Sequence, residues 1–355
     1  MEPKDISSAV SLVVPSVQEL VKEPLTRIPP RYIRLDQDPP VISSSLSSNP
    51  ELPIIDMKRL LSLDSVDSEL EKLHLACRDW GFFQLINHEV SSSLIEKVKE
   101  ETQEFFKLPL DEKKKYAQKP GDFQGFGQLF VVSEEQKLDW ADVFSMITLP
   151  SHLRKPHLLP KLPQPFRDTI DEYSKEIEKV ALRTLMFISK ALKMEVEEIK
   201  SLFDDGLQII RINYYPPCPQ PEQVIGLTPH SDGPGITLLL QVNQVDGLEI
   251  KKDGNWIPVM PHPNAFIVNI GDIMEMVTNG EYRSIQHRAV VNANKERLSI
   301  ATFVSPKVDA NIGPATSLIT PEKPPRFRSV PLSDYLKNRL SKKLDVKGNI
   351  EQYYI

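Results

Sequence analysis

The stretch Pro229-His230-Ser231-Asp232-Gly233 places an imidazole and a carboxylate two residues apart, and His287 supplies a second imidazole far downstream. Residues i and i+2 of a strand point the same way, so His230 and Asp232 can face one ion. Two imidazoles and one carboxylate are a recognised ligand set for non-haem Fe(II) with open coordination positions. The pattern predicts a metal centre, although a His-x-Asp pair by itself is more often a surface coincidence.

A second polar pair follows His287 on another apolar run, Arg297-Leu298-Ser299. A guanidinium buried among apolar residues must find an anion, because an unpaired buried charge is costly. Its planar fork suits a carboxylate in two-point fashion, and Ser299, two residues along the same strand, can donate to the same group. The alternative is an internal ion pair between Arg297 and an Asp or Glu of this chain.

Composition describes an ordinary globular protein. The chain has 355 residues, 40% hydrophobic, 26% charged, with a net charge of -6. An acidic balance with dispersed Lys and Arg disfavours nucleic acid as a partner. Cys77 and Cys218 lack CxxC spacing, so neither a disulfide framework nor a structural zinc is expected. The apolar run at 9–14 is too short for a signal peptide, and no stretch approaches the ~20 apolar residues that span a bilayer. We expect a cytoplasmic protein, not attached to a membrane.

The first 200 residues are expected to form a lead-in and a cover. Residues 1–50 mix prolines with a serine run at 43–48, which predicts an extended segment. Residues 51–200 predict an N-terminal cover of helices and short strands. Within this cover, apolar residues at spacings of three and four predict a long packing helix over 165–194.

Two capping boxes predict where the earlier helices of the cover begin. Ser68 with Glu71 precedes one apolar periodic run, which Gly81 ends, and Ser93 with Glu96 precedes the next.

Residues 205–307 change to short apolar runs separated by turn residues, which predicts an antiparallel barrel or jelly roll. Asp253-Gly254 between two such runs is a strong hairpin signal. Residues 308–355 predict a proline-rich linker, with a closing helix over 333–344 that we expect to cover the pocket.

Several motifs together identify a family resemblance. The chain resembles the plant Fe(II)/2-oxoglutarate-dependent dioxygenases over most of its length. It is most similar to the specialised-metabolism branch that holds the senescence-related dioxygenase-like proteins and the benzylisoquinoline alkaloid O-demethylases. The motifs that carry this resemblance are Pro53-Ile54-Ile55-Asp56, Trp80-Gly81-Phe82-Phe83-Gln84, Asn213-Tyr214-Tyr215-Pro216-Pro217-Cys218-Pro219, Gly226-Leu227-Thr228-Pro229-His230-Ser231-Asp232, Asn269-Ile270-Gly271-Asp272, His287-Arg288 and Glu296-Arg297-Leu298-Ser299.

The resemblance implies a mainly β fold with helices, in which a distorted jelly roll, the double-stranded β-helix, is flanked by helices. Residues 51–200 then correspond to the non-haem dioxygenase N-terminal region and 205–307 to the Fe(II)/2-oxoglutarate dioxygenase core. It also implies that His230, Asp232 and His287 hold iron as the catalytic centre.

The same resemblance assigns the cosubstrate residues. It places Arg297 and Ser299 on the distal carboxylate of 2-oxoglutarate, helped by Asn213 and Tyr215. The implied reaction uses O2, with ascorbate as reductant, and couples decarboxylation of 2-oxoglutarate to succinate and CO2 with oxidation of a small molecule. Hydroxylation is the default outcome, and attack on an O-methyl carbon gives net demethylation. The expected substrate is a mostly apolar alkaloid, flavonoid, terpenoid or hormone.

Four residues are candidates for the wall of the substrate pocket, where apolar side chains with few polar contacts are expected. These are Gln128, Phe130, Phe144 and Phe303. The alternative for each aromatic residue is plain core packing. No exposed apolar element demands a partner, so we expect a monomer.

Two other functions share these residues. One is an oxidase of the same fold that uses the Arg-Ser pair for its substrate instead of 2-oxoglutarate, against which Asn213 and Tyr215 argue. The other is a non-catalytic ligand-binding protein, which the intact set of His230, Asp232 and His287 disfavours.

The sequence departs from the family pattern at Glu89, where the family usually has Gly. If this position requires a left-handed turn, Glu89 adds strain of about 1 kcal/mol without touching the metal.

Overall fold

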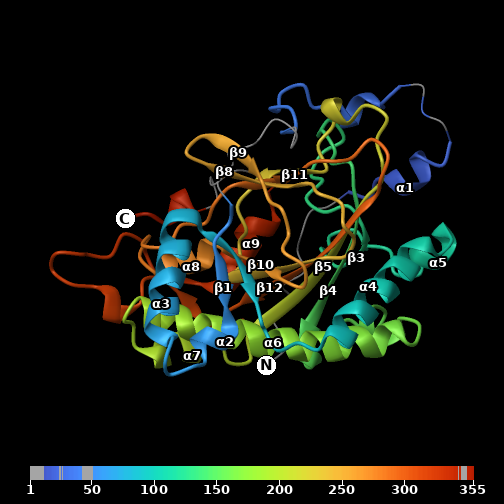
Figure 1. The fold of residues 1–355 in the computed structure, drawn as a ribbon. Coiled ribbons are helices and arrows are strands. Elements are labelled where there is room, and N and C mark those ends of the chain that lie inside the picture. The colour runs from blue at the N-terminus through green and yellow to red at the C-terminus, as the bar shows by residue number, and fades with distance from the viewer. Residues whose placement is uncertain (1–11, 24, 26, 42–50, 343, 345–349) are drawn as a thin grey trace.

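The computed structural model describes residues 12–23, 25, 27–41, 51–342, 344 and 350–355, and within this part of the chain two facing sheets form the core (Figure 1). Neighbouring strands are antiparallel apart from β1 and β2, which run parallel. The major sheet holds, in spatial order, β1 (Ile54–Asp56), β2 (Phe82–Ile86), β10 (Phe266–Ile270), β7 (Ile236–Gln241), β12 (Arg297–Ser305), β5 (Leu207–Tyr215), β4 (Asp142–Leu149) and β3 (Gly125–Gly127). The minor sheet holds β6 (Leu227–His230), β11 (His287–Ala289), β8 (Leu248–Lys252) and β9 (Asn255–Pro258). A third pair joins β13 (Asn311–Ile312) to β14 (Val330–Pro331). The predicted jelly roll flanked by helices is confirmed.

Helices surround this core. The α-helices are α1 (Val17–Leu20), α2 (Met57–Leu60), α3 (Val66–Leu75), α4 (Ser92–Lys107), α5 (Leu110–Lys114), α6 (Phe166–Ala191), α7 (Val196–Phe203), α8 (Asp272–Val277) and α9 (Leu332–Leu340). One π-helical turn, Ala76–Trp80, follows α3 and ends at Gly81, whose φ of 62° is left-handed. Short 3-10 helices lie at Pro30–Tyr32, Ser151–Leu153, Leu159–Lys161, Pro221–Gln223, Thr316–Leu318 and Glu351–Tyr353. No helix in the described part is both long and apolar enough to cross a lipid bilayer.

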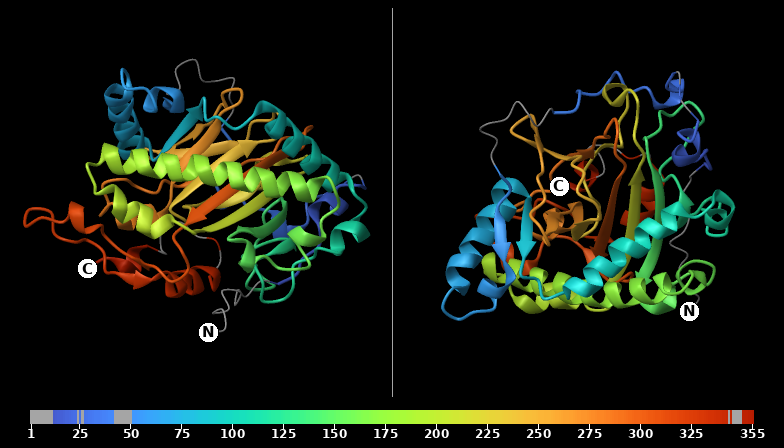
Figure 2. Two further views of the ribbon diagram at one scale, coloured as in Figure 1. Left: turned by 90° about the horizontal axis from the view of Figure 1, so that it is seen from below. Right: turned by 45° about the vertical axis from the view of Figure 1, so that its right-hand side comes forward.

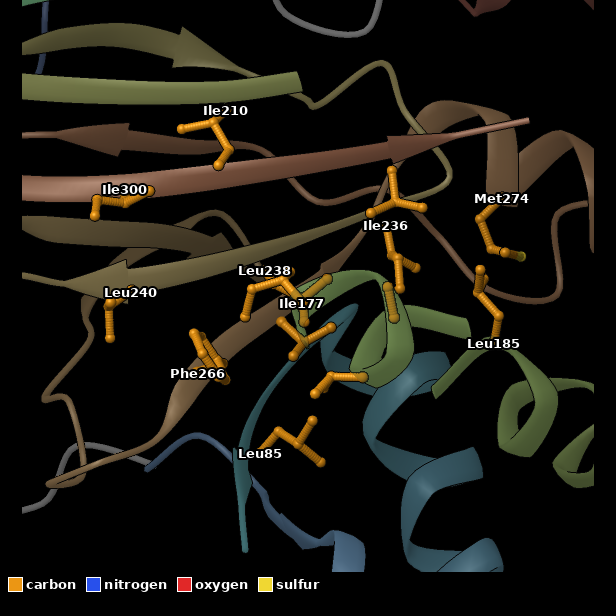
Figure 3. Close-up of a cluster of buried hydrophobic side chains, with 14 of the residues drawn as sticks. Leu85, Ile177, Leu185, Ile210, Ile236, Leu238, Leu240, Phe266, Met274 and Ile300 are labelled. Carbon is orange, nitrogen blue, oxygen red and sulfur yellow. The ribbon is translucent and has the colours of Figure 1, made fainter. Parts of the chain in front are cut away.

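Helix α6 crosses the outer face of the major sheet, on the side opposite the minor sheet (Figures 1 and 2). Its apolar residues recur every three or four positions, so Ile170, Ile177 and Leu185 share one buried face, as expected for residues 165–194. Figure 3 shows Ile177 beside Leu238 of the sheet and Leu185 beside Met274 of α8.

Strand alternation then decides what faces the interior between the sheets. On β5, Ile210 and Ile212 are fully buried in the same hydrophobic core as α6. The residues that alternate with them, Ile209, Arg211 and Asn213, line cavities between the two sheets. Because side chains of a strand alternate between its faces, one face of β5 packs under the helix while the other forms the wall of a site.

The predicted hairpin is present between β8 and β9. Asp253 and Gly254 both have positive φ, at 50° and 83°, as a two-residue type I′ turn requires.

Both predicted helix starts are wrong by two or three residues. Helix α3 follows Ser65, and Ser68 lies inside its first turn, where its hydroxyl donates to the Ser65 carbonyl. Helix α4 is capped by Ser91, whose Oγ accepts the Leu94 N–H, so Ser93 is again inside the helix. Several neighbouring serines offer the same cap, and the entering backbone decides between them.

The serine run at 43–48 lies outside the described residues, whereas the described part of 12–41 is anchored to the core. Asp142 at the start of β4 accepts hydrogen bonds from the Val17 and Gln18 N–H groups and from the Ser16 hydroxyl. The expected closing helix is present as α9 but ends at Leu340 rather than at residue 344.

We expect Glu89→Gly to stabilise the fold relative to Glu89→Ala by about 1 kcal/mol in urea unfolding. Glu89 is exposed, has a φ of 67°, and forms an ion pair with Arg183. Both variants lose that ion pair, but only Gly relieves the left-handed strain. Equal unfolding midpoints would show that the backbone at this position is unstrained.

Candidate metal centre and active-site cavity

His230 and His287 are opposite each other in the ladder between β6 and β11, and Asp232 follows β6 by two residues. The Nε2 atoms of His230 and His287 lie 3.5 Å and 3.7 Å from Asp232 Oδ1. All three ligand atoms lie within 4.8 Å of one another, and each residue is buried. Within the described residues this is the group of three side chains able to hold a metal ion.

Hydrogen bonds to backbone carbonyls set the orientation and the tautomer of the two imidazoles. His230 Nδ1 lies 2.8 Å from the Thr228 carbonyl, and His287 Nδ1 lies 3.2 Å from the Ile285 carbonyl. A carbonyl only accepts, so each Nδ1 carries the proton and each Nε2 keeps its lone pair for a metal.

Asp232 is oriented from the major sheet. Its Oδ2 accepts hydrogen bonds from Thr237 Oγ1 on β7 and Asn269 Nδ2 on β10, each at 2.8 Å. The other oxygen, Oδ1, is left facing the two histidines. Neither Thr237 nor Asn269 was predicted as a site residue, although Asn269 lies in one of the quoted motifs.

The electrostatics suit a divalent cation. Burial raises the pKa of Asp232, but His287, His230 and the Asn269 hydrogen bond outweigh it and hold this pKa far below its usual range. Burial and the neighbouring His230 lower the pKa of His287 to about 4. At neutral pH the site therefore offers a carboxylate and an unprotonated imidazole. A set of two imidazoles and one carboxylate fits Fe(II).

Beside this cluster, a polar cavity wall is formed by neighbouring rows of β5 and β12. Arg297 pairs with Tyr215 in the ladder and Ser299 with Asn213, and all four side chains line the same cavity as the metal cluster. The Arg297 guanidinium carbon lies 5.3 Å from the centre of the Tyr215 ring.

Arg297 has no acidic partner among the described residues, although it is 2% exposed. The hydrogen-bond partners of its guanidinium there are uncharged, the Tyr215 side chain and, at 3.4 Å from Nη2, Gln241 Oε1, and its Nε has none. The Oδ1 of Asn213 also lacks a partner in this part of the chain. The predicted alternative, an internal ion pair for Arg297, is therefore not found in the described structure, and the wall is suited to an external anion.

A second, mostly apolar cavity opens from the metal cluster. Phe130 and Phe303, both expected as pocket residues, line it together with Leu129, Leu336 and Leu340.

The other two expected pocket residues do not line this cavity. Phe144 is on the face of β4 that points away from the cavity, and its ring is stacked on that of Phe105 with 4.7 Å between the ring centres. Its neighbour Ser145 faces the cavity. Gln128 is buried near Tyr32, with which it forms a hydrogen bond. The expectation for Phe144 is wrong, and its alternative of core packing holds, because alternation along β4 turns Ser145 toward the cavity and Phe144 into the core.

Helix α9 lines the apolar cavity and also contacts the chain around Asp232. Arg339 donates to the Ser231 carbonyl and, at 3.2 Å, to Asp272 Oδ2, and the Tyr335 hydroxyl donates to the Gly233 carbonyl at 2.9 Å. A Cβ on Gly233 would lie 2.4 Å from Arg339 Nε, so glycine permits this approach.

Comparison with known families matches both parts of the chain. Residues 206–306 match the 2OG-Fe(II) oxygenase superfamily, and residues 52–162 match the non-haem dioxygenase in morphine synthesis N-terminal family.

Named relatives match along nearly the whole length. Protein SRG1 of Arabidopsis thaliana is 55% identical over 354 residues, covering 99% of each chain. The oxoglutarate-dependent flavonoid 7-O-demethylase 1 of Ocimum basilicum is 53% identical, covering 96% of this chain and 91% of its own. Codeine O-demethylase of Papaver somniferum is 52% identical, covering 96% of each. Among solved structures, that of JOX2 in complex with 2OG, Fe and JA has a TM-score of 0.86 and 35% identity, covering 96% of this chain and 98% of its own.

We expect Thr237→Val to weaken Fe(II) binding by about 10- to 100-fold, because Asp232 loses one of the two donors that orient it. Anaerobic titration of Fe(II) against a competing chelator measures this loss.

The matched control is Thr184→Val in α6, which also removes a buried hydroxyl hydrogen bond but lies outside the metal site. Equal iron affinity in the two variants would contradict a role for Thr237 in orienting Asp232.

Proposed function

Because this chain belongs to the 2OG-Fe(II) oxygenase superfamily, we propose that His230, Asp232 and His287 hold its Fe(II) and that Arg297 and Ser299 bind its 2-oxoglutarate. The chain is an enzyme of the Fe(II)- and 2-oxoglutarate-dependent oxygenase class. The observation that carries the residue assignment is the buried Arg297, which has no acidic partner among the described residues and lies on the wall of the cavity that holds the metal cluster.

Each polar residue of the wall has a distinct task in this proposal. Arg297 offers a planar fork to the distal carboxylate of 2-oxoglutarate, and Ser299 donates to the same group. Tyr215 packs against the guanidinium, and Asn213 donates at 3.4 Å to Ser299 Oγ, which orients that hydroxyl. The free Oδ1 of Asn213 accepts a hydrogen bond from bound solvent or ligand.

Bound iron and 2-oxoglutarate supply, with O2, the oxidising power through decarboxylation of 2-oxoglutarate to succinate and CO2. The residues of the chain hold the reactants and exclude water. Phe130, Phe303 and Leu336 enclose the apolar cavity next to His230 and Asp232, where a C–H bond of the substrate would lie. Ascorbate is the proposed reductant that keeps the iron ferrous.

We propose hydroxylation or O-demethylation of a small, mostly apolar specialised metabolite. The names of the similar flavonoid and codeine O-demethylases and the apolar wall of the cavity support this. Hydroxylation of an O-methyl carbon gives a hemiacetal, which breaks down to formaldehyde and a free hydroxyl. The second candidate, an oxidase that does not use 2-oxoglutarate, is disfavoured by the pairing of Asn213 and Tyr215 with Ser299 and Arg297.

We further propose a monomeric enzyme of the cytoplasm. The buried free thiols of Cys77 and Cys218 suit a reducing compartment. The apolar face of α6 is buried against the chain's own sheet rather than left for a partner. Size-exclusion chromatography with light scattering tests the oligomeric state.

We expect anaerobic titration of the Fe(II) protein with 2-oxoglutarate to produce the visible charge-transfer band of a chelated keto acid. Arg297→Ala should weaken 2-oxoglutarate binding by about 100-fold or more, because two charge-assisted hydrogen bonds are lost.

Lys295→Ala is the matched control, since it removes an exposed cation close in sequence. If the midpoint of the 2-oxoglutarate titration is unchanged in Arg297→Ala, 2-oxoglutarate binds elsewhere. Iron binding without any band would favour the oxidase instead.

A further inference from the structure

The described structure buries four arginines, and the surroundings of three of them are accounted for. They are Arg34, Arg211, Arg288 and Arg297. Arg288 is paired with Glu249 at 2.6 Å, and Arg34 with Asp36 at 3.2 Å. Arg297 faces the cosubstrate in the proposed function. The fourth, Arg211, has no such account.

Arg211 is 7% exposed, yet its Nε lacks a hydrogen-bond partner and its guanidinium forms no ion pair with any described residue. The groups that act on its charge are the Tyr215 hydroxyl and then Asp139 and Asp232, neither of which forms an ion pair with it. Asp139 is already engaged by the Thr228 hydroxyl and N–H, and Asp232 by the metal site. Burial lowers the pKa of Arg211, as expected of a cation with too little negative charge around it.

Its place in the sheet separates Arg211 from the cosubstrate residues. Along β5 and β12 the inward-facing rows are Tyr215 with Arg297, then Asn213 with Ser299, then Arg211 with Ala301, then Ile209 with Phe303. Arg211 thus stands where the polar wall meets the apolar cavity. It lies two rows, or roughly 13 Å along the strand, from the row of Arg297. Ala301 opposite is small and leaves the guanidinium room.

Among the described residues that line the apolar cavity, Arg211 is the cation without an ion-pair partner. The other cation of its described lining, Arg339, is bound to Asp272 and the Ser231 carbonyl. Phe130, Phe303 and Leu340 supply only apolar surface. A ligand that fills this cavity therefore meets one unsatisfied guanidinium close to the metal cluster, and the fork of a guanidinium matches a carboxylate in two-point fashion.

We propose that Arg211 is a specificity-determining residue that binds a carboxylate on the substrate, so that the substrate class is a small, mostly apolar carboxylic acid. This inference rests on the proposed function and narrows it. The carboxylate would lie on Arg211 and the apolar body against Phe130 and Phe303, which positions a C–H bond of that body beside His230 and Asp232.

The test compares acids with their methyl esters on the holoenzyme. Protein loaded anaerobically with Fe(II) and 2-oxoglutarate is titrated by calorimetry with cinnamate, 2-naphthoate and decanoate, and with the methyl ester of each. For at least one pair we expect the acid to bind at least tenfold more tightly than its ester. In Arg211→Met, which keeps the length of the side chain without its charge, that preference should disappear while ester affinity stays within threefold.

Two further measurements separate this inference from the proposed function. The 2-oxoglutarate charge-transfer titration should stay within threefold of the wild-type midpoint in Arg211→Met. Arg211→Lys, which keeps the charge but not the fork, should retain part of the preference for acids and guards against a folding defect in the Met variant.

Each adverse outcome has its own meaning. Acids that bind no better than their esters to the wild type would overturn the inference while leaving the charge-transfer result, and so the proposed function, intact. A large loss of 2-oxoglutarate affinity in Arg211→Met would assign Arg211 to the cosubstrate and also overturn it.

Discussion

The structure depends on one buried carboxylate that is shared between two sheets. Asp232 presents Oδ1 to the histidines of the minor sheet, while Thr237 and Asn269 of the major sheet hold Oδ2. The Asp272 N–H also donates to the Asp232 carbonyl at 2.7 Å. The spacing between the sheets therefore sets the geometry of the ligand atoms. Packing of the core and the affinity of the metal centre are consequently coupled, because a displacement of either sheet moves one side of the same carboxylate.

Because side chains alternate between the two faces of a strand, β5 and β12 also form a cavity wall that changes from polar to apolar along its length. Residues of one parity on β5 and β12 lie in the core under α6, and residues of the other parity form the inner wall. Along that wall the side chains pass from the polar row of Arg297 and Tyr215 through Arg211 to the apolar row of Ile209 and Phe303. In the proposed function, a single pair of strands thus supplies the surroundings of both the cosubstrate and the substrate, and the ladder of hydrogen bonds fixes their relative placement.

Sequence reasoning reached the fold class, the long helix α6 and the Asp253-Gly254 hairpin, because each has a strong local signal. The His230-x-Asp232 and Arg297-x-Ser299 pairs could be predicted for the same reason. Side chains at every second residue of a strand share a face, so counting from Arg297 correctly places Phe303 on the cavity wall. No polar anchor fixes the parity of β4 in the sequence, so nothing there shows that Phe144 packs in the core rather than on the pocket wall. Arg211 was overlooked, although it continues the period of two through Asn213 and Tyr215. The donors to Asp232 come from distant strands, which spacing alone does not bring together.

The contacts of α9 bear on the order in which the protein is made. Arg339 holds the Ser231 carbonyl across a sequence separation of 108 residues, and Tyr335 holds Gly233 in the same way. At roughly 5–20 residues per second, a ribosome needs about 5–20 s to travel from one to the other. During that interval the nascent chain carries its first histidine and its carboxylate in a segment that still lacks the clamp of the helix. The complete set of contacts around the candidate metal site, including the hydrogen bonds from α9, therefore exists only in the completed chain.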